Sequence, residues 1–243
     1  MVMQTAQIKY IDLLKKCVSH WIWLPEEDKK KRYDGRDWPK ASEGETMIGL
    51  VRLDNILYCI NKIIEDNIDG DFIEAGVWRG GAVIFMKGIL EAFEIKDRKI
   101  WVADSFQGVP RPDIESFPED KEDMLYQFEE LKVTKQEVIN NFKKYDLFDD
   151  NIRFLEGWFK DTLYHAPIQK LALLRVDGDL YESTFQALDA LYPKLAVGGF
   201  CIIDDYGTFD YCAKAVTDYR EKNNITDQII DIDSWGIFWR KSK

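Results

Sequence analysis

The sequence predicts an α/β protein: a Rossmann-like sheet of seven strands, mostly parallel, with an antiparallel last strand. From residue 71 onward, short apolar segments alternate with segments whose apolar residues recur at helical spacing. Such alternation is typical of a parallel sheet with helices on both faces. The last two apolar segments, 228–232 and 236–240, are separated by only three residues, too few for a helix. They are therefore expected to form an antiparallel hairpin.

Length, composition and charge narrow the class of protein. A chain of 243 residues, 46% hydrophobic and 32% charged, suits one soluble α/β domain. A formal net charge of −11 argues against a nucleic-acid partner and against docking on an anionic membrane. No apolar run approaches the ~20 residues that span a bilayer, and lysines interrupt the apolar residues of the N-terminus. The cysteines have no Cys-x-x-Cys spacing and are expected to be free thiols in a reducing cytoplasm: Cys17, Cys59, Cys201 and Cys212.

The N-terminal region is expected to differ from the rest. Residues 5–23 carry apolar residues at helical spacing, whereas residues 25–45 are polar and rich in charge. Two interpretations of residues 25–45 remain open: a flap over a site, or a disordered surface loop. Thr46 is expected to cap the helix that follows. We therefore divide the chain into an N-terminal helix and substrate-covering flap, 1–47, and a main domain, 48–243.

The remaining elements follow in order. Strands are expected at 71–75, 99–103, 152–156, 171–176 and 199–203, before the hairpin, and helices near 80–94, 134–144, 180–192 and 208–223. Residues 105–130 form a second long segment, acidic and with aromatic residues, which would suit a wall of a substrate site.

Acidic residues lie where several strands end. Glu74, Asp104, Asp177 and the pair Asp204-Asp205 occupy four of the first five strand ends, and Gly157-Trp158 occupies the other. Because ligands of open α/β sheets bind at the carboxyl ends of the strands, this edge is the expected site.

The first strand end carries a glycine turn that suits a nucleoside-like ligand. Gly76, Gly80 and Gly81 would let the backbone approach a ligand at the start of a helix, although the spacing departs from the dinucleotide fingerprint. Asp104, about 30 residues after Glu74, could accept both hydroxyls of a ribose, or could simply cap its loop. Trp158 could lie against an adenine or pack in the core. Two acids at successive strand ends suit ribose and a positive charge, and S-adenosylmethionine carries both.

A second group of acids predicts a metal site. Asp177 and Asp204-Asp205 follow strands expected to be neighbours, about 4.8 Å apart. Carboxylates are the ligands that Mg²⁺ prefers. Neither strand end is expected to bring a neighbouring cation in sequence, so a bound divalent metal is the simplest way to neutralise the three charges. Alternatively, Asp205 caps the helix near 208 and Asp204 meets a distant lysine. Asp179 could cap the helix near 180 or face the substrate. The only histidines, His20 and His165, lie away from the strand ends, so a histidine base is not supported.

Six sequence blocks together resemble one family, the macrocin O-methyltransferase (TylF-type) family, whose members methylate sugar hydroxyls with S-adenosylmethionine and Mg²⁺. The blocks are 46–54, 74–81, 103–108, 157–163, 174–184 and 198–207, and the resemblance runs from about Asp37 to the C-terminus. The resemblance implies a class I methyltransferase fold, a homodimer, and Asp177 or Asp179 as the base. It places the metal on Asp177, Asp204 and Asp205. It places the cofactor on Thr46, Met47, Glu74, Ala75, Gly76, Val77, Trp78, Arg79, Asp104, Ser105, Phe106, Gly157 and Trp158.

The function expected from this resemblance is methyl transfer to a sugar hydroxyl. The sugar would be a deoxysugar of a glycosylated natural product, or one linked to a nucleotide or a surface polysaccharide. The alternative is a metal-dependent phenol or catechol O-methyltransferase, whose members typically have an Asp-Asn pair where this chain has Asp204-Asp205. A binding module without activity and a nicotinamide dehydrogenase are both disfavoured, because the expected acids are present and the dinucleotide fingerprint is not.

Overall fold

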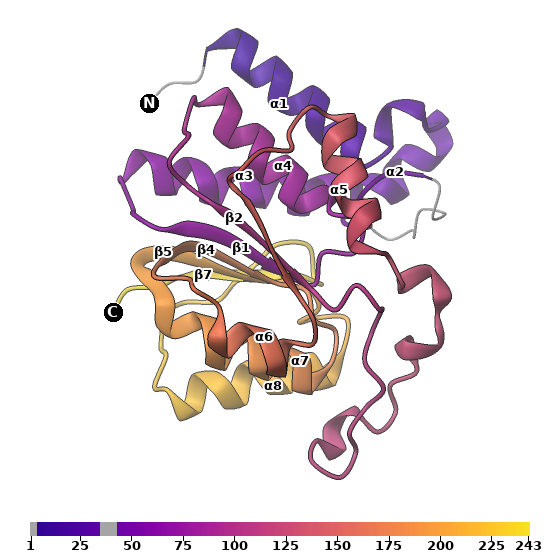
Figure 1. Ribbon diagram of the computed structural model, residues 1–243, viewed down its shortest axis with the longest axis vertical. Helices are drawn as coiled ribbons and strands as arrows, with labels where there is room; N and C mark the ends of the chain where they lie inside the picture. Colours follow the sequence, from indigo (N-terminus) through magenta and orange to yellow (C-terminus); the bar gives the residue numbers. More distant parts are fainter. Residues whose placement is uncertain (1–3, 35–42) are drawn as a thin grey trace.

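The computed structural model describes residues 4–34 and 43–243, which form a seven-stranded sheet covered by helices on both faces (Figure 1). The strand order is β3-β2-β1-β4-β5-β7-β6. The strands are β1 (Asp71–Ala75), β2 (Ile100–Asp104), β3 (Ile152–Glu156), β4 (Leu171–Val176), β5 (Leu195–Ile203), β6 (Ile230–Asp231) and β7 (Ile237–Arg240).

The sheet has the predicted directions. β1 to β5 pair in parallel, whereas β7 runs antiparallel to both β5 and β6. The predicted hairpin and the antiparallel last strand are therefore confirmed. β1 lies between β2 and β4: β2 and β3 lie on one side of it, and β4 and β5 lie on the other. The strand order therefore reverses between β1 and β4. Such a switch point leaves a crevice at the carboxyl ends of the two strands, where ligands bind in open α/β sheets.

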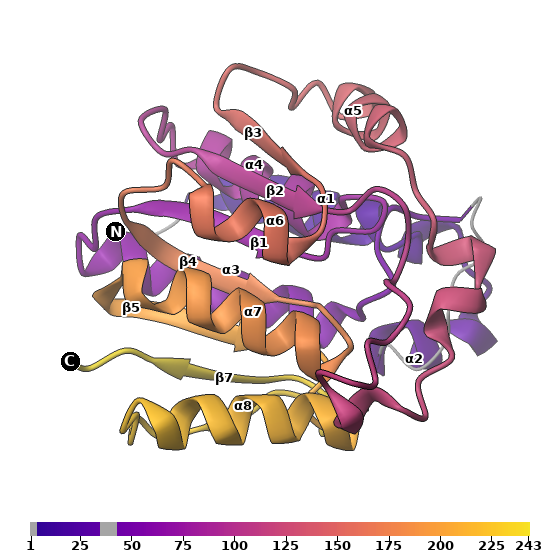
Figure 2. The same cartoon turned by 60° about the horizontal axis from the view of Figure 1, so that its bottom comes forward.

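The helices that precede β3 in the chain lie on one face, and those that follow it lie on the other (Figures 1 and 2). The first group is α1 (Thr5–Val18), α2 (Glu26–Asp34), α3 (Leu50–Glu65), α4 (Gly81–Ala92) and α5 (Lys135–Lys144). The second is α6 (Phe159–Thr162), α7 (Tyr181–Leu191) and α8 (Asp210–Lys222). Short 3₁₀ helices span Trp21–Trp23, Pro118–Asp120, Leu125–Gln127, Glu129–Leu131, Leu163–His165 and Tyr192–Lys194.

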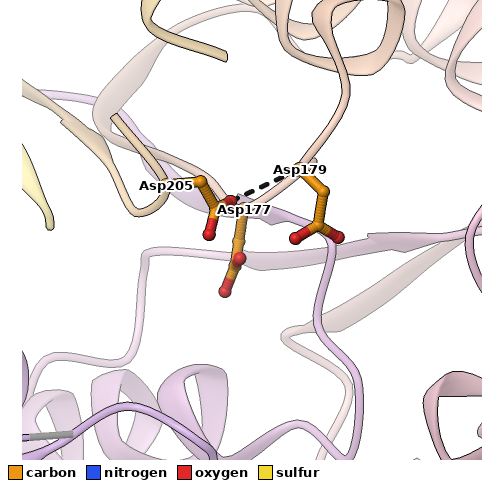
Figure 3. A group of neighbouring side chains, drawn as sticks. All are labelled: Asp177, Asp179 and Asp205. Carbon is orange, nitrogen blue, oxygen red and sulfur yellow. Dashed lines mark hydrogen bonds between the residues drawn. The ribbon is translucent and has the colours of Figure 1, made fainter. Parts of the chain in front are cut away.

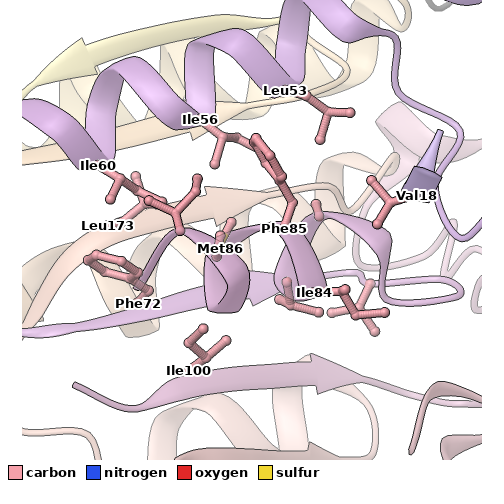
Figure 4. Packing of buried hydrophobic residues seen from close by; sticks show 14 of the residues in the cluster. Val18, Leu53, Ile56, Ile60, Phe72, Ile84, Phe85, Met86, Ile100 and Leu173 are labelled. Atoms are coloured by element: carbon pink, nitrogen blue, oxygen red, sulfur yellow. The ribbon is translucent and has the colours of Figure 1, made fainter. Parts of the chain in front are cut away.

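One hydrophobic core fills the space between α1, α3, α4 and the sheet (Figure 4). Every residue of α4 from Gly81 to Leu90 is buried, because the helix lies between the sheet and the outer helices. Gly88 lets α1 approach closely: a Cβ at this position would lie 2.0 Å from a methyl carbon of Leu14. The apolar face of α1 thus belongs to the core of the main domain, and each buried side chain of this kind contributes roughly 1.5–3 kcal/mol.

A second core lies on the other face, between the sheet and α7 and α8. It contains the fully buried Trp239 of β7 and the buried thiols of Cys201 and Cys212. All four cysteines are free. Among the described residues, no helix combines the length and the apolar character needed to cross a membrane.

The N-terminal region departs from the prediction in two ways. Thr46 does not cap α3: the cap residue is Gly49, and the Thr46 hydroxyl accepts a hydrogen bond from the N–H of Ile48 (3.3 Å). Residues 26–34, expected to be a flap or a loop, form α2. Acidic residues in its first turn and basic ones in its last complement the helix dipole. Part of the flap prediction, residues 35–42, falls outside the described residues.

Candidate active site

A cavity of about 400 Å³ opens at the carboxyl edge of the sheet, beside the switch point between β1 and β4. Its volume is within the usual range for small-molecule sites. Ten of the residues predicted for the site line it: Met47, Gly76, Trp78, Asp104, Ser105, Trp158, Asp177, Asp179, Asp204 and Asp205. Segment 105–131 lines the cavity as well, through Val109, Leu125 and Leu131.

The glycine turn after β1 is shaped by close contacts within the protein. Gly76 has a φ of +90°, and a Cβ there would lie 1.7 Å from the carbonyl oxygen of Asp177. Only glycine therefore allows β1 and β4 to end side by side. Gly81 approaches the backbone of Glu45, whose carbonyl accepts the Gly81 N–H (2.7 Å). The start of this helix was expected to supply free N–H groups to a ligand, but the Gly81 N–H is taken up by the chain itself.

Asp104 binds the backbone of the loops on either side of it. One carboxylate oxygen accepts the N–H of Val77 and the other accepts that of Phe106, both at 2.8 Å. The loop-capping interpretation of Asp104 is therefore confirmed. The Ser105 hydroxyl also donates, at 3.5 Å, to the oxygen that accepts from Phe106, so the lone pair left for a ligand in the cavity is that of the oxygen bonded to Val77.

Seven of the residues predicted to bind cofactor do not line the cavity. Arg79 is an example: its guanidinium donates to the carbonyl of Gly44 (3.0 Å) and pairs with Glu137. Its neighbour Trp78 lines the cavity, and the Trp78 indole N–H donates to the carbonyl of Glu130 (2.9 Å). The residues absent from the lining are Thr46, Glu74, Ala75, Val77, Arg79, Phe106 and Gly157.

The buried guanidinium of Arg175, on β4, joins three of the acids. It pairs with Glu74, with Asp177 (2.8 Å) and with Asp204. Burial alone would lower the pKa of Arg175, but attraction by Asp204, Asp177 and Glu74 outweighs it and holds that pKa well above its ordinary value. Burial raises the pKa of Glu74 to about 8, although Arg175 opposes the shift.

A second buried arginine, Arg52 of α3, approaches from the opposite side. It pairs with Asp204 and, through its Nε, with Asp233 (2.8 Å), and its guanidinium lies 5.4 Å from the ring centre of Trp235. The interpretation that these strand ends have no nearby cation is therefore wrong. Arg175 was detectable in the sequence: it lies two residues before Asp177, and alternate residues of a strand share a face. The partnership of Arg52 depends on the tertiary fold.

Three other carboxylates lie close together (Figure 3). One oxygen from each of Asp177, Asp179 and Asp205 lies within 4.8 Å of the other two, and the N–H of Asp179 donates to Asp205 (3.2 Å). Burial, followed by repulsion from Asp177, raises the pKa of Asp179 well above its ordinary value. Burial and repulsion from Asp179 and Asp177 do the same to Asp205. Asp204, expected in this group, instead has both oxygens paired with arginines.

This group fits a divalent cation. All the donors are carboxylate oxygens, which suit Mg²⁺. In an octahedral Mg²⁺ site with bonds of about 2.1 Å, adjacent ligands lie about 3.0 Å apart and opposite ligands about 4.2 Å apart. The three oxygens, within 4.8 Å of one another, would therefore move closer together to bind one ion. Six carboxylates (Glu74, Asp177, Asp179, Asp204, Asp205 and Asp233) share two guanidiniums here. The excess negative charge is relieved by protonation, in keeping with the raised pKa values of Glu74, Asp179 and Asp205, or by a bound cation.

The fold and the site define a class I methyltransferase. The model of the family described as Macrocin-O-methyltransferase (TylF) matches residues 8–241, and the chain belongs to this family of O-methyltransferases. It is similar to a demethyldecarbamoylnovobiocin O-methyltransferase of Streptomyces niveus (50% identity, covering 87% of this chain and 80% of the relative). It is also similar to a mycinamicin III 3''-O-methyltransferase of Micromonospora griseorubida (44% identity, covering 96% of each chain).

A solved structure shows the same fold. The O-methyltransferase NovP superimposes with a TM-score of 0.93 at 46% identity, covering 98% of this chain and 100% of NovP. A calicheamicin methyltransferase, with a TM-score of 0.64, 16% identity and coverage of 99% and 94%, shares the fold. The prediction of fold and family is confirmed.

Proposed function

We propose that this protein transfers the methyl group of S-adenosylmethionine to a hydroxyl of a sugar unit in a glycosylated small molecule. The observation that carries the proposal is the set of strand-end aspartates around the cavity of a macrocin-family fold. The named relatives support the acceptor class: one acts on a rhamnosyl group of a tetracenomycin (46% identity, Streptomyces olivaceus, covering 98% of this chain and 94% of the relative), and another on mycinamicin III.

S-adenosylmethionine would lie along the ends of β1 and β2. The Asp104 oxygen bonded to Val77 keeps a lone pair for a ribose hydroxyl, and Trp158 offers an indole face for the adenine. Gly76 and Met47 form the wall next to the aspartates, whose negative charge favours the sulfonium. The residues behind this wall act by holding it. Glu74, for example, fixes Arg175.

The metal would be held by Asp177 and Asp205, with the third carboxylate from Asp179 or Asp204. Asp179 belongs to the close group, whereas Asp204 has two arginine partners but retains further lone pairs. A divalent cation bound there would supply Lewis-acid chemistry: it would lower the pKa of an acceptor hydroxyl and help to orient it. Asp177 or Asp179 then accepts the hydroxyl proton, while the cavity walls exclude water from the sulfonium methyl. Arg52 and Arg175 keep the neighbouring carboxylates in place.

The N-terminal region would cover the acceptor, as proposed for residues 1–47. Met47 lines the cavity, and α1 and α2 lie on the same side of the sheet as α3 (Figure 1). A homodimer, which the family resemblance implies, stays a prediction. The identity of the sugar is set by the outer walls of the cavity, which include the aromatic rings of Phe159, Phe209 and Trp235.

A competition assay tests the acceptor class. The protein is incubated with S-adenosylmethionine, Mg²⁺, demethyldecarbamoylnovobiocin, a rhamnosyl glycoside and a simple catechol, and the products are resolved by mass spectrometry. We expect a single methyl group on a sugar hydroxyl, and we expect excess chelator to stop the reaction. Methylation of the catechol alone would favour the phenol methyltransferase alternative. Undiminished sugar methylation in chelator would remove the metal from the proposal.

A further inference from the structure

Helix α7 begins at a cap supplied by a distant part of the chain. Its own N-cap residue, Leu180, offers no side-chain cap. Instead, the fully buried carboxylate of Asp120 accepts the N–H of Tyr181 through one oxygen (2.6 Å) and that of Glu182 through the other (3.0 Å). A carboxylate at a helix N-terminus satisfies free N–H groups and interacts favourably with the helix dipole.

The segment that carries Asp120 is attached to α8 as well. Asp123, which is 4% exposed, accepts a hydrogen bond from the hydroxyl of Tyr211 (3.0 Å) and another from the N–H of Leu125 (3.0 Å). Figure 2 shows this segment passing beside the starts of α7 and α8. Since residues 105–131 also line the cavity, Asp120 and Asp123 join a cavity wall to the two helices that begin at its rim.

The loop between β4 and α7 has only four residues, 177–180, and two of them are Asp177 and Asp179. Asp179 adopts a φ of +55°, which is uncommon for a residue with a side chain. Its N–H donates to Asp205 (3.2 Å). At one end the loop is fixed by β4, and at the other by the first turn of α7. The direction of the Asp179 side chain therefore depends on how firmly that first turn is held.

We propose that Asp120 is a positioning residue for methyl transfer: by binding the first two N–H groups of α7, it fixes the loop that carries Asp177 and Asp179. This inference rests on the proposed function, because it assigns Asp120 a role in that reaction. Asp120 itself touches neither cofactor nor acceptor in this account. It acts through Asp179, and it makes the position of Asp179 depend on how the cavity wall formed by residues 105–131 packs against α7.

Asp120→Ala, with Thr134→Ala as a matched control, tests this role. Thr134 also caps a helix: it is the N-cap residue of α5, its hydroxyl accepts one N–H, that of Glu137 (3.2 Å), and it does not line the cavity. Both variants lose a helix cap, so a purely structural role predicts similar behaviour in both. Asp120→Asn is the conservative variant, since its amide oxygen can still accept one of the two N–H groups.

Two readouts decide the proposal, at a temperature where all variants are folded. With the sugar acceptor that the wild type methylates, we expect Asp120→Ala to lower kcat by roughly tenfold to a hundredfold, with the KM for S-adenosylmethionine within about twofold of wild type. The kcat of Asp120→Asn should fall between those of Asp120→Ala and the wild type, and Thr134→Ala should keep the wild-type kcat. Hydrogen exchange of the Asp179 amide, which does not bond to Asp120, should quicken in Asp120→Ala alone.

A folded Asp120→Ala variant with the wild-type kcat overturns the inference, as does an equal loss of kcat in Thr134→Ala. If the wild type methylates no acceptor at all, the proposed sugar methylation fails separately. Hydrogen exchange at Asp179 then decides the role of Asp120 alone: an unchanged rate in Asp120→Ala contradicts it.

Discussion

Asp179 and Asp204 both line the cavity, yet their surroundings predict opposite effects of removing their charge. Asp179 lies among carboxylates, within 4.8 Å of Asp177 and Asp205. Asp204 is 4% exposed and accepts hydrogen bonds from both Arg52 and Arg175. We therefore expect Asp179→Asn to stabilise the metal-free protein and Asp204→Asn to destabilise it.

The expected magnitudes follow from these distances. Two full charges 4.8 Å apart repel by about 332/(20 × 4.8), or roughly 3.5 kcal/mol, at an effective dielectric constant of 20. Because the raised pKa of Asp179 means that part of this repulsion is relieved by protonation, we expect a gain of about 1 kcal/mol and a rise in Tm of roughly 2–4 °C. Removing the shared partner of two buried guanidiniums costs roughly 3–5 kcal/mol, which lowers Tm by roughly 6–20 °C.

Thermal unfolding in excess chelator, followed by calorimetry, measures both variants without metal. Repeating the scan with Mg²⁺ then reports binding, since a cation that binds only the folded protein raises Tm. The wild type should gain stability from Mg²⁺ and Asp179→Asn should gain less. A Tm of Asp179→Asn below that of the wild type in chelator would refute the reasoning, because it would mean that the Asp179 charge is stabilised by its surroundings.

Three further substitutions test the cofactor side of the cavity. Asp104→Ala removes the acceptor of two backbone N–H groups at the cavity wall, so the Kd of S-adenosylmethionine, measured by calorimetry, should rise at least about tenfold; an unchanged Kd would exclude Asp104 from the cofactor site. Trp158→Leu should weaken the binding of S-adenosylmethionine by about 1 kcal/mol if the indole stacks on adenine, and an affinity equal to that of the wild type would assign Trp158 to packing within the protein. Gly76→Ala places a Cβ 1.7 Å from the Asp177 carbonyl at a φ of +90°, so chemical denaturation should show a loss of more than about 3 kcal/mol; wild-type stability would contradict the close approach of β1 and β4.

The sheet could be predicted because its elements carry strong local signals. The buried strands β1 and β4 were predicted with the bounds that the structure has, since each is a short apolar run bounded by polar residues or glycine. The antiparallel end followed from the shortness of the 233–235 connection. In contrast, α2 was not predicted, because its apolar content is low. It is held instead by favourably placed charges and by the buried guanidinium of Arg32, which donates to the carbonyl of Ser19 (3.0 Å).

The location of the candidate site could be predicted for a topological reason. Residues that directly follow parallel strands reach the same edge of the sheet, so Asp104, Asp177 and Asp205 had to lie near one another. Which of the acids pair with arginines, and which lie together in the close group of carboxylates, could not be predicted. Whether Asp204 or Asp179 faces Asp205 depends on Arg52, whose side chain reaches the site across the fold, and on the pairing of Arg175 with Asp204 of the neighbouring strand end.

The contacts of segment 105–131 could not be predicted from the sequence either. Its acidic and aromatic composition suggested a cavity wall, but Asp120 binds N–H groups about 60 residues further along the chain. No local pattern encodes such a contact, because the cap and the helix meet only after the sheet has brought β2 and β4 to the same edge. Thr46, which resembles a cap in sequence, is not one, because α3 begins only at Leu50 and its cap residue is Gly49.

The central claim is that the strand-end aspartates hold a divalent cation beside the methyl donor. A crystal of the protein grown with Mn²⁺ and S-adenosylhomocysteine, measured at the manganese absorption edge, tests it most directly. We predict one strong anomalous peak within about 2.3 Å of carboxylate oxygens of Asp177 and Asp205, with Asp179 or Asp204 as the third ligand. A fully occupied cofactor site with no anomalous peak among these aspartates would contradict the account.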